Sequence, residues 1–260
     1  MNISMEIRLE EDRHWWFASR TRAILTFLTQ FVGPSAAGER LILDVGGGAG
    51  NMAHHLQHFG RYIGVDLYAR PLRVARQRGL TGVQGDAVRL PFATAAFDLI
   101  ALLDTVEHIA DDHAVLAECY RVLRDQGILV VTVPAFMFLW SYNDELNRHQ
   151  RRYTRGELIS KLAKHGFHVL RSSYTNFFIF PLALATVVTR RGEPPPHLAS
   201  LYFDDDAYQV DMEPVPAPVN AILTQVGRVE AALLRHFSFP WGTGIIAIAR
   251  KERARTQSDR

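Results

Sequence analysis

The segment LILDVGGGAG (residues 41–50) decides the fold, because a short apolar run ends directly on a cluster of glycines. Gly46, Gly48 and Gly50 have no Cβ, so the backbone there can approach a ligand closely. The following stretch, residues 51–59, is suited to a helix. In open α/β sheets, ligands bind where such a strand ends. We therefore expect a ligand at this edge of a sheet.

The same alternation of short apolar runs and helical stretches continues to residue 133. Residues 97–104 are apolar along their length and do not alternate, which is typical of strands buried on both faces of a parallel sheet. Such repetition predicts a doubly wound α/β sheet. The further strands are expected at residues 61–66, 82–86, 97–104 and 128–133, and the further helices at residues 69–79 and 112–127.

The second half of the chain is less regular. Thr154 precedes Glu157 by three residues, a capping-box spacing that predicts a helix over 154–166. Residues 190–218 are rich in proline and acids and are expected to be irregular or partly disordered. Strands are expected at 167–175 and 244–251, and a helix at 219–237 whose single apolar face holds Val219, Ile222, Leu223, Val226, Val229 and Leu233.

Both ends of the chain are expected to add a helical cap to the α/β core. Near the N-terminus, Trp16, Ile24, Leu28 and Phe31 can share one helical face over the core. The expected organisation is a helical lid over 1–39, a ligand-binding α/β core over 40–175, a cap or acceptor insertion over 176–240, and a last core strand with a tail over 241–260.

Composition excludes several classes of protein. The 260 residues include 29 Lys and Arg and 27 Asp and Glu, and this near balance gives no electrostatic basis for nucleic acid binding. The lone Cys119 excludes an internal disulfide and a Cys-rich metal site, and the eleven histidines are scattered, so no metal site is expected. The acidic N-terminus lacks a signal peptide, which predicts a cytoplasmic protein. The longest apolar run, Phe177–Val188, is too short to span a bilayer and contains Pro181.

Acidic residues follow the expected strands at useful places. Asp66 lies 20 residues after Gly46, where a carboxylate can accept both hydroxyls of an adenosine ribose. Asp86 ends the next strand, where it could meet an adenine amino group. Asn51 stands where a dinucleotide site would need its third glycine. Each of these features also has a structural interpretation. The glycine loop could be only a strand-to-helix turn, Asp44 could cap the following helix, and Asp86 could be a turn residue.

Four motifs in order, DVGGGAG, the strand ending at Asp66, GDAVRLPF and FDLIALLDTVEHI, resemble those of class I S-adenosylmethionine-dependent methyltransferases. The resemblance is strongest to the small-molecule group called methyltransferase type 11 and covers roughly residues 40–175. It implies S-adenosylmethionine as cofactor. It also implies a Rossmann-like, seven-stranded, mostly parallel sheet in which the last strand, residues 244–250, inserts antiparallel.

The resemblance also implies roles for single residues. Asp44 and the glycines 46, 48 and 50 would lie near the methionine moiety, Asp66 and Leu67 at the ribose, Asp86 and Ala87 at the adenine, and Leu103 and Asp104 at the sulfonium end. We expect Arg20 to reach the methionine carboxylate, with the aromatic run Trp15, Trp16 and Phe17 acting either as a lid or as an apolar anchor. Glu107 and His108 begin a helix, where capping or hydrogen bonding is as good an interpretation as catalysis.

The segment LWSYNDELNRHQRRYT (139–154) supplies the acceptor side of the expected site. His149 is the preferred general base, because its ordinary pKa lies near neutrality. Asp144 or Glu145 would orient His149 or act as the base in its place, so Asp144 and Tyr153 join His149 as candidate catalytic residues. Arg151 and Arg152 would hold an anionic acceptor, and Trp140 and Tyr142 would wall the pocket. Alternatively, the basic residues form a solvated face and Tyr153 packs at the helix start.

These expectations combine into one hypothesis, methyl transfer to the oxygen or carbon of a small, rather apolar metabolite, such as one with a prenyl phosphate head. The alternatives are a non-catalytic cofactor-binding partner and a nicotinamide-dependent oxidoreductase. The apolar stretches 176–188, 219–237 and 237–242 would form an acceptor pocket, a homodimer surface or a membrane-touching patch.

Overall fold

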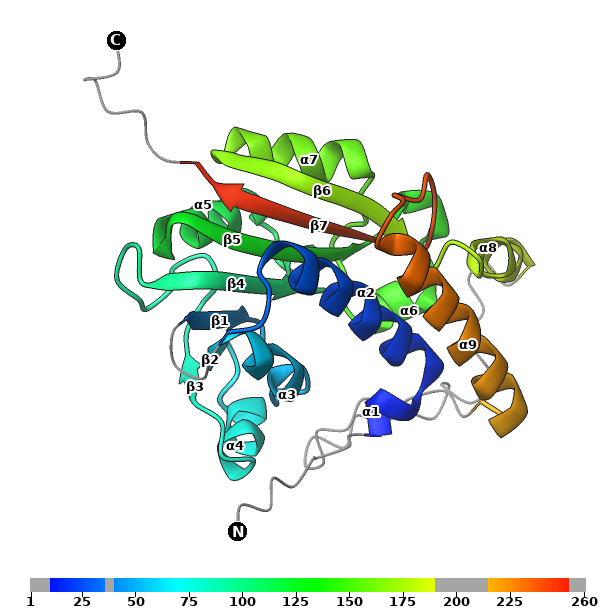
Figure 1. The fold of residues 1–260 in the computed structure, drawn as a ribbon, viewed down its shortest axis with the longest axis horizontal. Helices are drawn as coiled ribbons and strands as arrows, with labels where there is room; N and C mark the ends of the chain where they lie inside the picture. The colour runs from blue at the N-terminus through cyan, green and yellow to red at the C-terminus, as the bar shows by residue number, and fades with distance from the viewer. Residues whose placement is uncertain (1–9, 36–39, 190–214, 253–260) are drawn as a thin grey trace.

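The computed structural model describes residues 10–35, 40–189 and 215–252, and its centre is one seven-stranded sheet (Figure 1). The strand order is β3-β2-β1-β4-β5-β7-β6. The last strand, β7 (Gly244–Lys251), runs antiparallel to both of its neighbours, β5 (Leu123–Pro134) and β6 (Phe167–Thr175). The other strand pairs are parallel. The expected mostly parallel sheet with an antiparallel last strand is therefore confirmed.

The first half of the chain forms the elements that its alternating pattern predicts. The strands are β1 (Leu41–Val45), β2 (Arg61–Asp66), β3 (Gly82–Gln84) and β4 (Phe97–Leu103), and the helices between and after them are α3 (Ala53–Leu56) with the 3₁₀ turn η1 (Gln57–Phe59), α4 (Ala69–Gln77) and α5 (Asp112–Val122). Residues 42–45 and 99–103 are buried, as expected for strands covered on both faces. Beyond β5, α7 (Arg155–Lys164) begins at the predicted capping box between Thr154 and Glu157.

One predicted boundary is wrong. The helix expected over 112–127 ends at Val122, and β5 begins at the next residue. Leu123 pairs with Phe97 of β4 and is fully buried there. Leu123 continues the apolar helical stripe of residues 112–122 but belongs to the sheet. The periodicity of the sequence alone therefore does not mark the boundary between α5 and β5.

The cap is built mainly from α2 (Trp15–Phe31), which follows the single turn α1 (Glu10–Arg13), and from α9 (Ala217–Leu234). The two long helices lie side by side, with α2 in front of the sheet, whereas α5 and α7 lie on its other side (Figure 1). Ile24 and Leu28 of α2 are fully buried, as their spacing predicts.

The expected apolar face of α9 is wrong. Its buried residues are Gly227, Glu230 and Leu234, whereas three members of the predicted face, Val219, Ile222 and Val229, are exposed. The reason is a close approach of α9 to α2, because a Cβ at Gly227 would lie 2.0 Å from the Ser19 Oγ. The face of α9 that packs against α2 is therefore determined by the small Gly227 and not by the large apolar side chains of the helix.

We expect Gly227→Ala to destabilise the protein by about 1–3 kcal/mol, because the new methyl group overpacks the contact with Ser19. A helix otherwise favours alanine over glycine by up to about 1 kcal/mol. Gly156→Ala in α7 is the matched control, because a Cβ there meets no atom within 4 Å. Urea unfolding should show a loss for Gly227→Ala, partial recovery in the Ser19→Ala double variant, and no loss for Gly156→Ala. Equal stability of the two glycine variants would contradict the close approach.

The segment after β6 forms a helix that the sequence pattern did not assign, α8 (Phe180–Thr189), and none of its residues is buried. Short elements also follow β4 and β5, namely η2 (Val106–His108), η3 (Met137–Leu139) and α6 (Tyr142–Leu146). Within the described ranges, no helix has the length and apolar character needed to cross a bilayer. The irregular segment expected at 190–218 lies outside the described residues except for its last four positions.

Candidate active site

Polar side chains gather at the edge where the parallel strands end. Asp44 is the fourth residue of β1, Asp66 is the last residue of β2, and Asp104 directly follows β4. Parallel strands bring their carboxyl ends to one edge of a sheet, so three acids that are far apart in the sequence meet there. The loop after β5 adds Asp144 and His149 to the site.

The glycine loop after β1 is tightly packed against its surroundings. Gly46 has a φ of +74°, and a Cβ there would lie 2.4 Å from the Thr105 Cγ2. Gly50 has a φ of +77°, and a Cβ there would lie 2.2 Å from the Leu80 Cδ1. Both positions therefore require glycine for the turn itself, as the structural interpretation predicts.

Asp66 ties the glycine loop to β2. Its Oδ2 accepts a hydrogen bond from the Gly48 N–H (3.0 Å), and its Oδ1 accepts one from the Tyr68 N–H (2.9 Å). Burial raises the pKa of Asp66, and the two backbone hydrogen bonds oppose that rise. A carboxylate has about four acceptor positions, so each oxygen keeps one for a further donor. The side chain therefore fits the two hydroxyls of a ribose.

Asp44 is almost fully buried beside the loop, where its Oδ2 accepts a hydrogen bond from the Tyr62 hydroxyl (3.0 Å). Burial raises the pKa of Asp44 to about 7, with the Asp66 charge adding to the rise and Tyr62 and Arg20 opposing it. Asp44 therefore changes its charge near neutral pH. Its contact with Tyr62 anchors β1 to β2 and does not cap the following helix.

We expect the buried Asp44 to make the protein less stable as the pH rises. Its folded pKa of about 7 lies above the ordinary 3.8, so the folded state holds the proton more tightly. Stability is thus full below about pH 4 and falls as the pH rises through 7, by on the order of 4 kcal/mol for a change of this size. Asp44→Asn keeps an acceptor for Tyr62 and removes the ionisation. Urea unfolding at pH 5 and pH 8.5 should show the variant gaining on the wild type at the higher pH, and a constant difference would contradict the assignment.

Arg20 of α2 and Asp104 form an ion pair at this edge. The expected cofactor residue Arg20 is therefore at the site, but Asp104 already holds its guanidinium. Asp104 has a φ of +46°, and its N–H donates to the Thr132 carbonyl of β5 (3.0 Å). Leu103 beside it is buried. These contacts fix the end of β4 against the helical cap.

The residues expected at the adenine and ribose lie on the outer part of the same edge. Asp86 is exposed, and its Oδ1 accepts from the Val88 N–H (3.0 Å), which is a turn contact of the kind that its alternative interpretation predicts. Ala87 is half-buried and Leu67 is about half exposed (51%). All three lie on loops that follow β2 and β3.

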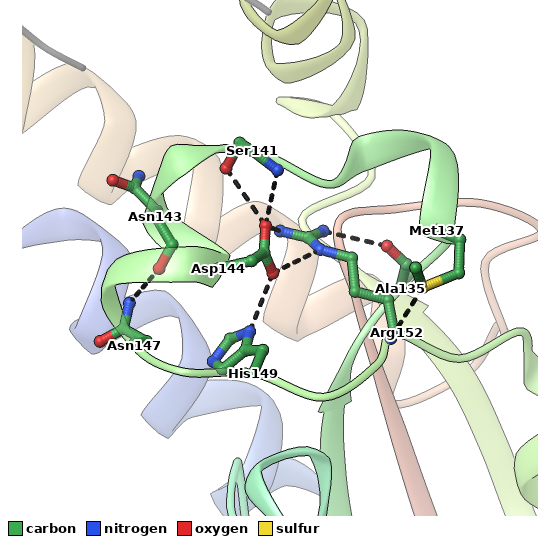
Figure 2. A network of polar contacts seen from close by, with 8 residues as sticks. All are labelled: Ala135, Met137, Ser141, Asn143, Asp144, Asn147, His149 and Arg152. Carbon is green, nitrogen blue, oxygen red and sulfur yellow. Dashed lines mark hydrogen bonds and ion pairs between the residues drawn. The ribbon is translucent and has the colours of Figure 1, made fainter. Parts of the chain in front are cut away.

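Asp144 is the centre of the polar network on the loop after β5 (Figure 2). Its Oδ1 contacts the His149 Nδ1 (2.8 Å) and accepts from the Arg152 Nε (2.7 Å), and its Oδ2 accepts from the Arg152 Nη2 (2.9 Å). The Ser141 N–H also donates to Oδ2 (2.8 Å). Despite burial, which opposes it, these hydrogen bonds and the Arg152 charge lower the pKa of Asp144 to about 2. The structure thus places Asp144 where it orients His149, and leaves Glu145 exposed.

Three residues expected to touch the acceptor instead make internal contacts. Arg152 donates hydrogen bonds from its Nε and Nη2 to Asp144 and from its Nη1 to the Ala135 carbonyl (3.1 Å). Arg151 contacts Asp112 and donates to the Ala110 carbonyl. The buried Tyr153 hydroxyl donates to Asp112 (2.9 Å), and burial with that neighbouring charge raises its pKa. These contacts occupy the groups that the anion grip and the catalytic hydroxyl would use. Tyr153 is buried directly before the start of α7, as its alternative interpretation predicts, whereas Arg148 and Gln150 of the basic run are exposed. Trp140 and Tyr142 are half-buried beside the network.

The sequence interpretation missed the importance of Glu107. Its side chain is fully buried, and neither carboxylate oxygen has a hydrogen-bond partner among the described residues. Burial, with the Asp104 charge adding to it, raises the pKa of Glu107 well above its ordinary value. An acid next to a histidine, directly after a buried strand, was the signal in the sequence, but helix capping explained it equally well.

The comparisons with known proteins point to methyltransferases. A family model described as a methyltransferase domain matches residues 43–131. A demethylmenaquinone methyltransferase from Mycobacterium marinum is 31% identical over 154 residues, which cover 57% of this chain and 62% of that protein. A ubiquinone biosynthesis O-methyltransferase from Hahella chejuensis is 32% identical over 135 residues, which cover 46% of this chain and 56% of that protein. The chain thus spans less than two thirds of the length of these relatives.

A solved structure extends the likeness to the whole fold. The Haemonchus contortus phosphoethanolamine N-methyltransferase 2, in complex with S-adenosylmethionine, superposes with a TM-score of 0.56 at 18% identity and covers 88% of this chain and 52% of that chain. The chain therefore shares the fold of this S-adenosylmethionine-bound methyltransferase. More narrowly, residues 43–131 are similar to the methyltransferase domain that this family model describes.

Proposed function

We propose that this protein transfers a methyl group from S-adenosylmethionine to a small acceptor with an apolar body. The observation that carries the proposal is the link between Asp66 and the glycine loop, because Asp66 holds the Gly48 N–H and keeps acceptor positions for two hydroxyls. The bound cofactor supplies the electrophilic methyl group. The protein then has to position the acceptor, exclude water and stabilise charge.

The remaining cofactor contacts are proposed from the same edge of the sheet. The backbone of Gly46 to Gly50 would lie along the methionine moiety beside Asp44. Arg20 would meet the methionine carboxylate, sharing its charge with Asp104. Leu67, Asp86 and Ala87, on the loops after β2 and β3, would surround the ribose and the adenine, and the buried Leu103 would line the sulfonium end.

Aromatic side chains at the ends of β5 and β6 support a flat acceptor. Phe136 stacks on Tyr174 with ring centroids 4.9 Å apart, and Phe177 stacks on Phe239 (4.7 Å) and Trp241 (5.2 Å). Aromatic rings favour offset stacking, so a planar acceptor ring would extend these stacks. The names of the two relatives both refer to quinones. We therefore propose a quinol-type ring with an apolar tail, in preference to a prenyl phosphate, since Arg151 and Arg152 make internal contacts.

The experiment uses the whole protein with methyl-labelled S-adenosylmethionine and three acceptors, namely a prenylated hydroquinone, a prenyl phosphate and an unprenylated phenol. Mass spectrometry should show label in the prenylated hydroquinone first. Calorimetry with S-adenosylmethionine tests the cofactor separately. Binding without transfer to any acceptor would favour the non-catalytic cofactor-binding partner, and absence of binding would refute the proposal.

A further inference from the structure

Glu107, His108 and His149 form a cluster at the end of β4. Each offers one ligand atom, and the three ligand atoms lie within 4.8 Å of one another. Glu107 and His108 belong to η2, whereas His149 comes from the loop after α6. The His108 and His149 rings meet edge to face with centroids 4.6 Å apart. Two separate loops therefore converge on one point.

The buried Glu107 carboxyl group lacks a partner among the described side chains, and a bound cation would compensate its negative charge. It has no hydrogen-bond partner among the described residues, and an isolated buried carboxylate is costly. The charged groups that act on it are Asp104, Arg20 and Arg152. Arg20 pairs with Asp104, and Arg152 pairs with Asp144. Both arginines are thus committed to other acids.

The two histidines are arranged to offer a free ring nitrogen. Asp144 also accepts hydrogen bonds from the Arg152 guanidinium and the Ser141 N–H, so it acts as an acceptor and the His149 Nδ1 donates to it. The other ring nitrogen of His149 then keeps its lone pair and faces away from Asp144 (Figure 2). His108 has a backbone hydrogen bond of its own with Asn147. A carboxylate or carbonyl behind a histidine is the usual arrangement around a metal-binding imidazole.

We propose that Glu107, His108 and His149 bind a divalent transition-metal ion such as Zn²⁺, with Asp144 and the Asn147 backbone orienting the histidines. Two imidazoles and one carboxylate are a donor set for this kind of ion. Ligand atoms about 2.1 Å from a shared ion lie at most about 4.2 Å apart, so small side-chain rotations close the site. Three protein ligands leave a position open, and the exposed His108 gives access from solvent.

The proposal deepens the proposed function and rests on it only for the role of the ion. The open position would hold the oxygen of the acceptor and keep it deprotonated beside Asp104. His149 would then be a metal ligand in place of the general base that the sequence suggested. Metal binding itself is independent of methyl transfer, because it is measured without cofactor or acceptor.

A second cluster, Asp12, His54 and His55, is the internal comparison. There, the His54 Nε2 contacts one Asp12 oxygen (2.9 Å) and the His55 Nε2 contacts the other (3.0 Å). Its three members therefore already satisfy one another, whereas Glu107 has no described partner. The unpartnered carboxylate of Glu107 therefore favours its cluster, and not that of Asp12, as the metal site.

The test titrates Co²⁺ into untagged, EDTA-treated full-length protein and follows the visible absorption of the bound ion. We expect one Co²⁺ per chain with a visible absorption band, and displacement by Zn²⁺. Glu107→Gln keeps the size of the side chain and should weaken binding at least 100-fold, as should His149→Ala. Asp144→Asn should weaken it by about 10–100-fold, the usual effect of losing such an orienting partner.

The double variant His54→Asn/His55→Asn is the matched control and should bind Co²⁺ like the wild type. Near-ultraviolet circular dichroism in EDTA checks that each variant is folded. Wild-type affinity in Glu107→Gln would overturn the proposal, as would loss of the band only in the His54/His55 variant. Intact Co²⁺ binding without methyl transfer would leave the metal site standing and reject the proposed function alone.

Discussion

Asp66→Ala is expected to lower the affinity for S-adenosylmethionine about 100-fold or more. The variant removes two acceptors for ribose hydroxyls, and hydrogen bonds to a charged group contribute about 1.5–3 kcal/mol each. It also leaves the Gly48 N–H and the Tyr68 N–H without their carboxylate, so the glycine loop loses its tie to β2. Calorimetric titration with S-adenosylmethionine measures the effect.

Two further variants separate recognition from loop structure. Asp66→Asn keeps one acceptor oxygen and should lose less affinity than Asp66→Ala. Asp125→Asn, on the far end of β5 near Lys251, changes the same net charge and should leave the affinity unchanged. An Asp66→Ala variant that binds as tightly as Asp125→Asn would show that the ribose lies elsewhere and would remove the basis of the proposed function.

Asp144→Ala is expected to lower the free energy of unfolding by about 3–5 kcal/mol, the usual effect of leaving a buried charge without its partner. Arg152 would keep its guanidinium in a site where its side chain is only 13% exposed. The Ser141 N–H and the His149 Nδ1 would lose their acceptor as well. The loop between β5 and α7 should therefore loosen, and methyl transfer should fall with it.

Glu145→Ala is the matched control for this prediction, because Glu145 is the exposed neighbour of Asp144 in the same short helix. A surface substitution of this kind changes stability by about 0.5 kcal/mol or less. Urea unfolding of both variants at one pH gives the comparison. A similar small loss in both would mean that the network around Asp144 is not the anchor of its loop.

Much of the fold follows from the sequence because its local signals and its packing agree. The apolar runs at 41–45 and 97–103 are strands buried on both faces, and the capping box at Thr154 begins α7 where its spacing predicts. The exceptions are positions where a tertiary contact overrides the pattern. Leu123 extends into the sheet although the helical stripe continues, and Gly227 turns α9 onto a face that periodicity does not favour.

The candidate site divides in the same way. Strand ends share an edge in any parallel sheet, so the sequence could place Asp44, Asp66 and Asp104 together. The partners of Arg151 and Tyr153 could not be predicted, because both meet Asp112, which lies about 40 residues earlier on another helix (sequence separation 41 for Tyr153). The burial of Glu107 without a partner could not be predicted either, because it depends on three-dimensional packing only.

The position of β7 has a consequence for how the molecule assembles. β6 lies at the border of the sheet, and its only neighbour there, β7, is made after α8 and α9. During synthesis, β6 forms its inter-strand hydrogen bonds only after β7 has been made. The pairing is slow because the two strands are far apart in the sequence and closing the intervening loop costs entropy. Nascent chains that end before residue 244 would lack β7, would leave the facing edges of β5 and β6 unpaired, and would be prone to aggregate.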